Sequence, residues 1–326
     1  MQLEKIGTGT LTLSGENTHT GGTTLSEGTL VMNSETALGT GTITFNDAST
    51  LKVNIPNPKI QNYVLINSEG NGTIDTNGQN VTFTNSIEGA GGLTKTGAGT
   101  LTLGGTYYTG PTTISEGTLL LPENSFMSST SLTIQNNAAV QTGIDLSSTN
   151  VSITGGSFIL GLTPLTAEVD VNSLSLNGGI IHFDMNDSSG FYDSDWLTFT
   201  ESVSLKSGVI DLSFNYGDEL AWWNNAASDP IQLMTTEQGG SIGEISNMQV
   251  TVSGLPTASW TLTTDNANVF LSPTNVPPEE APFWFANTDD IYEDWVVSFH
   301  FLKRLFSDIF REKYDIINVN IIDFSV

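Results

Sequence analysis

The densest group of potential metal ligands in this chain is an acidic stretch in its second half. The stretch contributes Asp184, Asn186, Asp187, Asp193 and Asp195. Carboxylate and amide oxygens are the ligands that calcium prefers, and the stretch is similar to the loop pattern D-x-[DN]-x-[DN]-G. Gly190 comes one position too late for that pattern, and no glutamate closes the loop at the required distance. We therefore expect a solvated acidic loop between two strands, with no metal ion and no other cofactor.

The residues that could form a hydrolase triad or a phosphate-binding loop do not occur in the required patterns. The three histidines, His19, His182 and His300, lie far apart in the sequence and in unlike surroundings. Serine is so abundant that no combination of Ser, His and an acid stands out as a hydrolase triad. The glycine pairs at 7–9 and 97–99 belong to an alternating β pattern, not to the strand-to-helix turn of a phosphate-binding loop. The sequence therefore predicts no catalytic and no cofactor-binding residue.

The charge balance narrows the choice of partners. The 326 residues include 35 Asp and Glu against 9 Lys and Arg, which gives a formal net charge of −26. Nucleic-acid binding needs a basic patch to neutralise phosphates, so we expect no nucleic-acid partner. The same charge disfavours adhesion to anionic lipid. The 33 glycines, together with abundant Thr, Ser and Asn, favour turns and short strands over helices.

The sequence contains one long repeat, which occurs twice and indicates how the strands of the chain are arranged. It reads LEKIGTGTLTLSGENTHTGGTTLSEGTLVM at 3–32 and LTKTGAGTLTLGGTYYTGPTTISEGTLLL at 93–121. In each copy a Thr-Leu-Thr-Leu run alternates polar and apolar residues, which places both leucines on one face of a strand. Short strands and glycine corners follow, with no helical spacing. Such a unit is typical of a β-solenoid turn, which must stack on its neighbours to bury its apolar face.

The run K-x-G-x-G-T-L-T-L-x-G followed by T-G-x-T-T-[LI]-S-E-G-T-L resembles the passenger-associated β-strand repeat of bacterial autotransporters. The resemblance covers both copies nearly end to end. It implies an all-β fold, a right-handed parallel β-helix that is exported through the outer membrane and displayed on a Gram-negative cell. The complete lack of cysteine agrees with passage through an oxidising periplasm.

We expect three parts along the chain. Residues 1–165 form a β-solenoid with both repeats. Residues 166–275 add further turns, in which 173–185 and 202–214 are a similar pair, and a cap that resembles the autochaperone module of autotransporters. Four aromatic residues could cover the last open strand edge: Phe214, Tyr216, Trp222 and Trp223. Residues 276–326 form a Pro-rich linker and a short helical tail.

The two ends of the chain suggest a fragment. Ile291, Trp295, Phe299, Leu302, Phe306 and Phe310 form a helical stripe in the tail. In the family a membrane β-barrel would follow here, but about 16 residues are too few for the eight strands of a small barrel. We expect a truncated or frameshifted tail; the alternative is a genuine helix that docks on the solenoid end. No signal peptide and no apolar run of about 18 residues occur, so contact with the outer membrane would require the missing barrel.

An enzyme is the alternative hypothesis, because parallel β-helices also include polysaccharide lyases and glycosidases. Such an active site needs carboxylates at matching positions on successive turns. Few acids recur in register; Glu27 and Glu116 do, but each lies in a Ser-Glu-Gly corner where we expect a role in the turn. Residues 1–302 contain five lysines and no arginine, which disfavours a site for acidic sugars.

The sequence therefore predicts a non-catalytic passenger fragment, a stalk or adhesin-like module at the cell surface or outside the cell. Partners would be a glycan or protein on a host or neighbouring cell, and copies could also associate with each other. Tyr107 and Tyr108 are the candidate contact residues, because exposed aromatic pairs bind sugars and proteins. The alternative for this pair is packing at a corner of the coil.

Overall fold

The chain is described by a computed structural model. Residues 1–274 are described apart from 69, 163–166, 188–191, 215–229, 237–240, 244, 254–259 and 266. This part of the chain consists of strands, turns and connecting segments, and it contains no helix that could span a membrane. The expected helical tail, the Pro-rich linker and three of the four expected cap aromatics (Tyr216, Trp222 and Trp223) lie outside the described residues.

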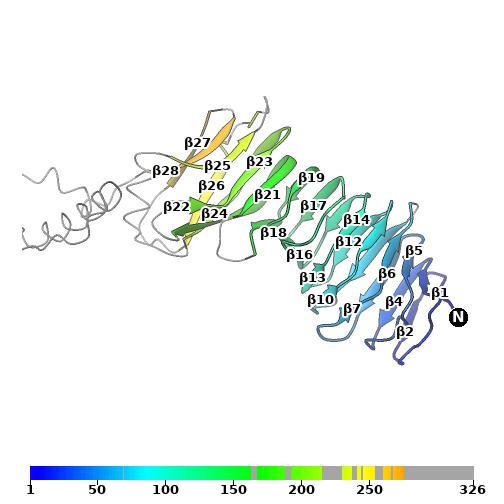
Figure 1. Cartoon of the computed structure of the whole chain (residues 1–326). Helices are drawn as coiled ribbons and strands as arrows, with labels where there is room; N and C mark the ends of the chain where they lie inside the picture. Colours follow the sequence, from blue (N-terminus) through cyan, green and yellow to red (C-terminus); the bar gives the residue numbers. More distant parts are fainter. Residues whose placement is uncertain are drawn as a thin grey trace, which may run out of the picture. The chain divides into compact units, whose positions relative to one another are not determined.

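Parallel strands stack in three rows (Figure 1), which we call A, B and C. Row A contains β1 (Leu3–Lys5), β3 (Thr23–Leu25), β5 (Ile43–Phe45), β8 (Val64–Ile66), β11 (Ile87–Gly89) and β14 (Thr106–Tyr108). Row B contains β2 (Thr10–Leu13), β4 (Gly28–Met32), β6 (Ser49–Val53), β9 (Asn71–Asp75), β12 (Gly92–Thr96), β15 (Thr112–Ile114), β17 (Ser131–Gln135) and β19 (Leu146–Thr154). Row C contains β7 (Lys59–Ile60), β10 (Val81–Phe83), β13 (Thr100–Leu103), β16 (Thr118–Leu121), β18 (Ala139–Thr142) and β20 (Ser157–Leu160).

From β6 to β16 the chain visits these rows in turn, B then C then A. The strands before β6 alternate between rows A and B, and those from β17 to β20 alternate between rows B and C. Within a row, each strand pairs in parallel with the strand one turn later. In row A, Leu3 pairs with Thr23, and the column continues through Ile43, Val64, Ile87 and Thr106. Successive partners are therefore 20, 20, 21, 23 and 19 residues apart. This is a parallel β-solenoid, as the repeat predicts; its right-handed sense stays a prediction.

Two long strands continue the coil beyond the repeats. β21 (Glu168–Asp187) pairs with β19 and then with β20, so it runs along both row B and row C. β24 (Val203–Phe214) follows β21, and β26 (Met248–Ser253) follows β24 in row C. The similar segments 173–185 and 202–214 are thus neighbouring turns, because Leu174 pairs with Val203 and Met185 with Phe214.

Within the described residues, antiparallel pairing between strands enters from β21 onward, after an isolated antiparallel bridge between Gln135 and Gly155. β22 (Tyr192–Ser194) folds back on β21. β23 (Trp196–Phe199) and β25 (Ile231–Thr236) extend the start of β21 in parallel, and then β28 (Asn268–Pro273) pairs antiparallel with both β25 and β27 (Trp260–Thr264). These pairings cover the edge that β25 would otherwise leave open for another strand.

The core is a set of stacks in which the inward residue of each strand lies over that of the next turn. In row B the stack runs Leu30, Leu51, Ile74, Lys95, Ile114, Ile134 and Ile153, and all seven side chains are buried. Adjacent strands lie about 4.8 Å apart, so branched aliphatic side chains fill this space with little void. Lys95 is the exception in this stack, because it is the one charged residue among aliphatic ones.

Candidate functional site

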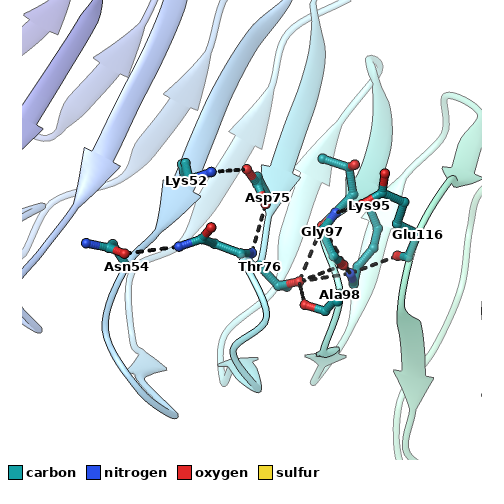
Figure 2. A network of polar contacts seen from close by, with 10 residues as sticks. Lys52, Asn54, Asp75, Thr76, Lys95, Gly97, Ala98 and Glu116 are labelled. Atoms are coloured by element: carbon teal, nitrogen blue, oxygen red, sulfur yellow. Dashed lines mark hydrogen bonds and ion pairs between the residues drawn. The ribbon is translucent and has the colours of Figure 1, made fainter.

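The second repeat builds a polar corner around Lys95 (Figure 2). The side chain starts at an inward position of β12 and is fully buried. Its Nζ donates to the carbonyl oxygens of Thr96 (3.1 Å), Gly97 (2.6 Å) and Glu116 (3.0 Å) and to Thr76 Oγ1 (3.0 Å). A buried ammonium is tolerated only when such acceptors replace its water shell. The corner thus satisfies a charge that the aliphatic stack alone would exclude.

The first repeat builds an equivalent corner around Lys5. Its Nζ donates to the carbonyl oxygens of Ile6 (3.0 Å), Gly7 (2.5 Å) and Glu27 (3.0 Å). The residue type gives no indication that either lysine is buried. The spacing does, because Lys5 lies two residues after Leu3 and therefore on the same face of the strand.

Glu27 and Glu116 belong to these corners. Each provides the backbone carbonyl that accepts from the lysine one turn earlier. The Glu116 carboxylate also accepts from the backbone N–H of Gly97 at 3.1 Å. The backbone carbonyl and the carboxylate of Glu116 therefore both form hydrogen bonds within the turn, which is the role expected for this residue.

The second corner changes the pKa of its lysine. Burial lowers the pKa of Lys95 from 10.5 to about 8, although the carboxylates of Asp75 and Glu116 act in the opposite direction. Asp75 in turn forms an ion pair with Lys52, at 3.0 Å (Figure 2). Its carboxylate also accepts from the backbone N–H of Asn77. A deprotonated lysine is a nucleophile, but here every approach to Nζ is filled by the turn, since the side chain has no exposed surface. The corner is therefore a structural element.

Exposed aromatic side chains gather elsewhere, on the outside of row A. Tyr107 is 54% exposed, whereas Tyr108 is fully buried and its hydroxyl bonds with Thr112 Oγ1 at 2.6 Å. Burial also raises the pKa of Tyr108. Packing in the coil, one of the two alternatives for this pair, thus applies to Tyr108, whereas Tyr107 is exposed, because neighbouring residues of a strand point to opposite faces. Tyr107 faces solvent beside Phe126, with ring centroids 5.6 Å apart.

The described part of the acidic stretch includes one buried carboxylate. Asp195 is fully buried, and its carboxylate accepts from the backbone N–H groups of Ala167 and Asp184, both at 2.6 Å. Burial raises its pKa from 3.8 to about 7, while the two N–H groups lower it. The expectation of a solvated loop is wrong for Asp195, because β22 folds back on β21 and turns this side chain inward. Asp187 and Asp193 lie on the two strands of that hairpin, on either side of 188–191, which lie outside the described residues.

Two of the three histidines, His19 and His182, lie within the described residues, and each has its own partners. His19 Nε2 lies 2.9 Å from Thr23 Oγ1 in the first repeat. His182 lies between two carboxylates, with Nδ1 2.9 Å from Asp211 and Nε2 3.5 Å from Asp184. Hydrogen bonding to Asp184 is the main reason that its pKa is raised. His300 lies outside the described residues. Within the described part of the chain, no three His, Asp or Glu side chains are grouped so that they could hold a metal ion.

Comparison with known proteins identifies the repeat. A family model described as the passenger-associated-transport-repeat matches residues 3–32 and 93–121. The chain is 36% identical over 248 residues to the adhesin BmaC autotransporter of Brucella suis biovar 1 (strain 1330), a match that covers 73% of this chain and 6% of that protein. The chain thus spans only a small part of this curated relative.

Among solved structures, the Haemophilus influenzae Hap adhesin matches with a TM-score of 0.35 and 11% sequence identity, over 77% of this chain and 32% of that one. The repeats, the identity to an autotransporter adhesin and the stacked parallel strands agree with one another. The chain belongs to the passenger domains of bacterial autotransporters that carry passenger-associated repeats.

Proposed function

We propose that this chain is a non-catalytic adhesive module, displayed on or released from the surface of a Gram-negative bacterium. The observation that carries the proposal is the 36% identity to an autotransporter adhesin across 73% of the chain. The β-solenoid suits this role, because each turn is held by its neighbours and its outward residues form an extended surface for contacts. Its partners would be glycans or proteins on a host or neighbouring cell, including further copies of the same chain.

The arrangement of acidic residues supports a binding module over a glycosidase. Glycoside hydrolysis needs two carboxyl groups that face one substrate at a fixed separation. The Glu116 carboxylate accepts from the backbone N–H of Gly97, and the buried carboxylate of Asp195 accepts from two backbone N–H groups.

The experiment is an adhesion assay with a simultaneous test for turnover. Beads coated with the full chain are offered to epithelial cells and to each other, and the purified chain is incubated with neutral and acidic polysaccharides. We expect the coated beads to adhere to cells or to cluster, with no release of reducing ends or unsaturated sugars. Failure to adhere to any surface would contradict the adhesive role, and release of sugar would show the enzyme instead.

A further inference from the structure

Four large apolar side chains are exposed together on the outside of row A. They are Tyr63 (58%), Leu65 (36%), Tyr107 (54%) and Phe126 (51%). They account for half of the eight large apolar side chains that are this exposed in the described part of the chain. Single exposed apolar residues need no explanation, but a cluster of them marks a contact surface.

The stacking of turns brings these residues together from distant parts of the sequence. Leu65 pairs with Glu88, and Glu88 with Tyr107, so the three side chains follow one line along row A. Tyr63 and Phe126 lie on a second line beside it, which also includes Ser86 and Gly105. The backbone N–H of Val64 donates to the Ser86 carbonyl, that of Ile87 to the Gly105 carbonyl and that of Thr106 to the Phe126 carbonyl. We call these six residues (Tyr63, Leu65, Ser86, Glu88, Tyr107 and Phe126) the row A patch.

A missing side chain lets the two rings at one end form a platform. Gly105 lies beside Tyr107, and a Cβ atom added at Gly105 would come within 3.2 Å of the Tyr107 ring. The ring of Tyr107 therefore lies across this glycine, toward Phe126. The two rings are tilted by 33° with centroids 5.6 Å apart. Together they present a broad aromatic surface to solvent.

Polar groups occupy the middle of the patch. Glu88 is exposed, and Ser86 donates to its carboxylate at 2.8 Å. Apolar side chains lie on both sides of this pair, Tyr63 and Leu65 one turn before it and the Tyr107–Phe126 platform after it. A carboxylate accepts hydrogen bonds from hydroxyl groups, and the faces of aromatic rings attract polarised C–H groups. This combination suits a pyranose ring, which has hydroxyl groups at its rim and C–H groups on its faces.

The charge and width of the patch decide between ligand classes. The residues on this line of row A are Glu4, Thr24, Thr44, Leu65, Glu88 and Tyr107, and none of them is basic. A sulfated or carboxylated sugar would therefore meet the negative charge of Glu88 and no positive charge on this line. A stable protein interface takes roughly 20–30 residues a side, far more than the six of this patch. Turns spaced about 4.8 Å apart place its contact groups at intervals similar to the length of one sugar unit.

We propose that the row A patch binds a neutral glycan chain that lies along the solenoid axis. One sugar stacks on Tyr107 and Phe126, the next gives its hydroxyl groups to Glu88, and a third contacts Leu65 and Tyr63. This inference rests on the adhesive role proposed above, since it names the ligand class and the surface that would serve it.

The test measures binding of the full chain to soluble oligomers of β-1,4-linked glucose, β-1,4-linked N-acetylglucosamine and α-1,4-linked glucose, each beside a sulfated counterpart. We expect at least one neutral oligomer to bind and its sulfated form to bind more weakly. Tyr107→Ala should weaken binding about tenfold, because one stacking contact is lost. Tyr107→Phe should bind as the wild type does, and Glu88→Gln should weaken binding.

Trp196→Ala is the matched control, since Trp196 is an exposed aromatic residue outside the patch. Binding that is unchanged in Tyr107→Ala, equal losses in Trp196→Ala, a preference for sulfated oligomers, or no binding to any neutral oligomer would each overturn the proposal. The bead assay separates this failure from that of the adhesive role. Beads coated with Tyr107→Ala that still adhere as well as wild type would leave adhesion intact and reject this surface.

Discussion

Lys5 and Lys95 occupy the same position of the two repeats, yet they lie in different rows of the solenoid. Lys5 ends β1 in row A, whereas Lys95 lies in β12 of row B. The two residues are 90 positions apart, and the turns between them take 19 to 23 residues each. This separation is not a whole number of turns, so the second copy enters the coil one row later. The repeat therefore specifies a corner and not a fixed face of the solenoid.

Removing the lysine side chain should weaken the corner. We expect Lys95→Ala to lower the free energy of unfolding by about 2–4 kcal/mol, because it leaves a cavity in the row B stack and removes the donor to several buried carbonyls. Lys59→Ala is the matched control: its side chain is exposed, so the change should stay within about 0.5 kcal/mol. Urea unfolding measures both. Equal stability of the two variants would contradict a structural role for Lys95.

The same corner should make stability depend on pH in the alkaline range. The pKa of Lys95 is about 8 in the folded chain against 10.5 for the unperturbed group. Between these values the unfolded chain binds more protons than the folded chain, so the contribution of Lys95 to stability rises with pH across this window. Below about pH 8 the buried charge lowers stability by a constant amount.

Comparison of wild type with Lys95→Met tests this expectation, because the methionine keeps much of the apolar stem without a titrating group. The difference in unfolding midpoint between the two proteins should shift in favour of wild type as the pH rises from about 8 to about 10.5. A difference that stays constant over this range would show that Lys95 keeps its proton.

Gly117 in the repeat corner is required for two reasons, its positive φ and the lack of space for a Cβ atom. Gly117 has a φ of +67°, and a Cβ atom there would lie 2.4 Å from the carbonyl oxygen of Gly99. Gly78 has a φ of +81° but nothing within 4 Å of such an atom. We expect Gly78→Ala to cost about 1–2 kcal/mol from backbone strain alone, and Gly117→Ala to cost clearly more. Thermal unfolding of both variants measures the difference, and equal losses would mean that the backbone yields around the added methyl group.

Asp195 should give the later turns a pH dependence in the acid range. Its pKa is raised from 3.8 to about 7. The folded chain therefore binds the proton more tightly, so the stabilisation is complete below about pH 4 and is lost as the pH rises through about 7. Amide hydrogen exchange at Asp184 and Ala167, whose N–H groups donate to this carboxylate, reports the change locally.

In that experiment protection of the two amides should fall between about pH 4 and about pH 7, after correction for intrinsic exchange. Asp195→Asn removes the titration and should abolish this fall. Glu123→Gln, a change at an exposed acid, should leave the profile as in wild type. The same fall in Asp195→Asn would assign the effect to another group.

The sequence by itself determined the class of fold and the family. Alternation in runs such as Thr10–Leu13 is local, and a glycine corner follows each run, so strands, bends and the apolar face can be found without knowing the neighbours. The parallel pairing of both repeats and the buried leucines agree with that interpretation.

Only the tertiary structure decided which residues share a surface. Leu65, Glu88 and Tyr107 are separated by 23 and 19 residues and become neighbours because loops of different length bring each turn into register. The same holds for Lys95, whose acceptors Thr76 and Glu116 come from the turns before and after it. Register between turns depends on the summed length of all intervening loops, which no local pattern encodes, and so the corner contacts and the row A patch emerge only once the coil is closed.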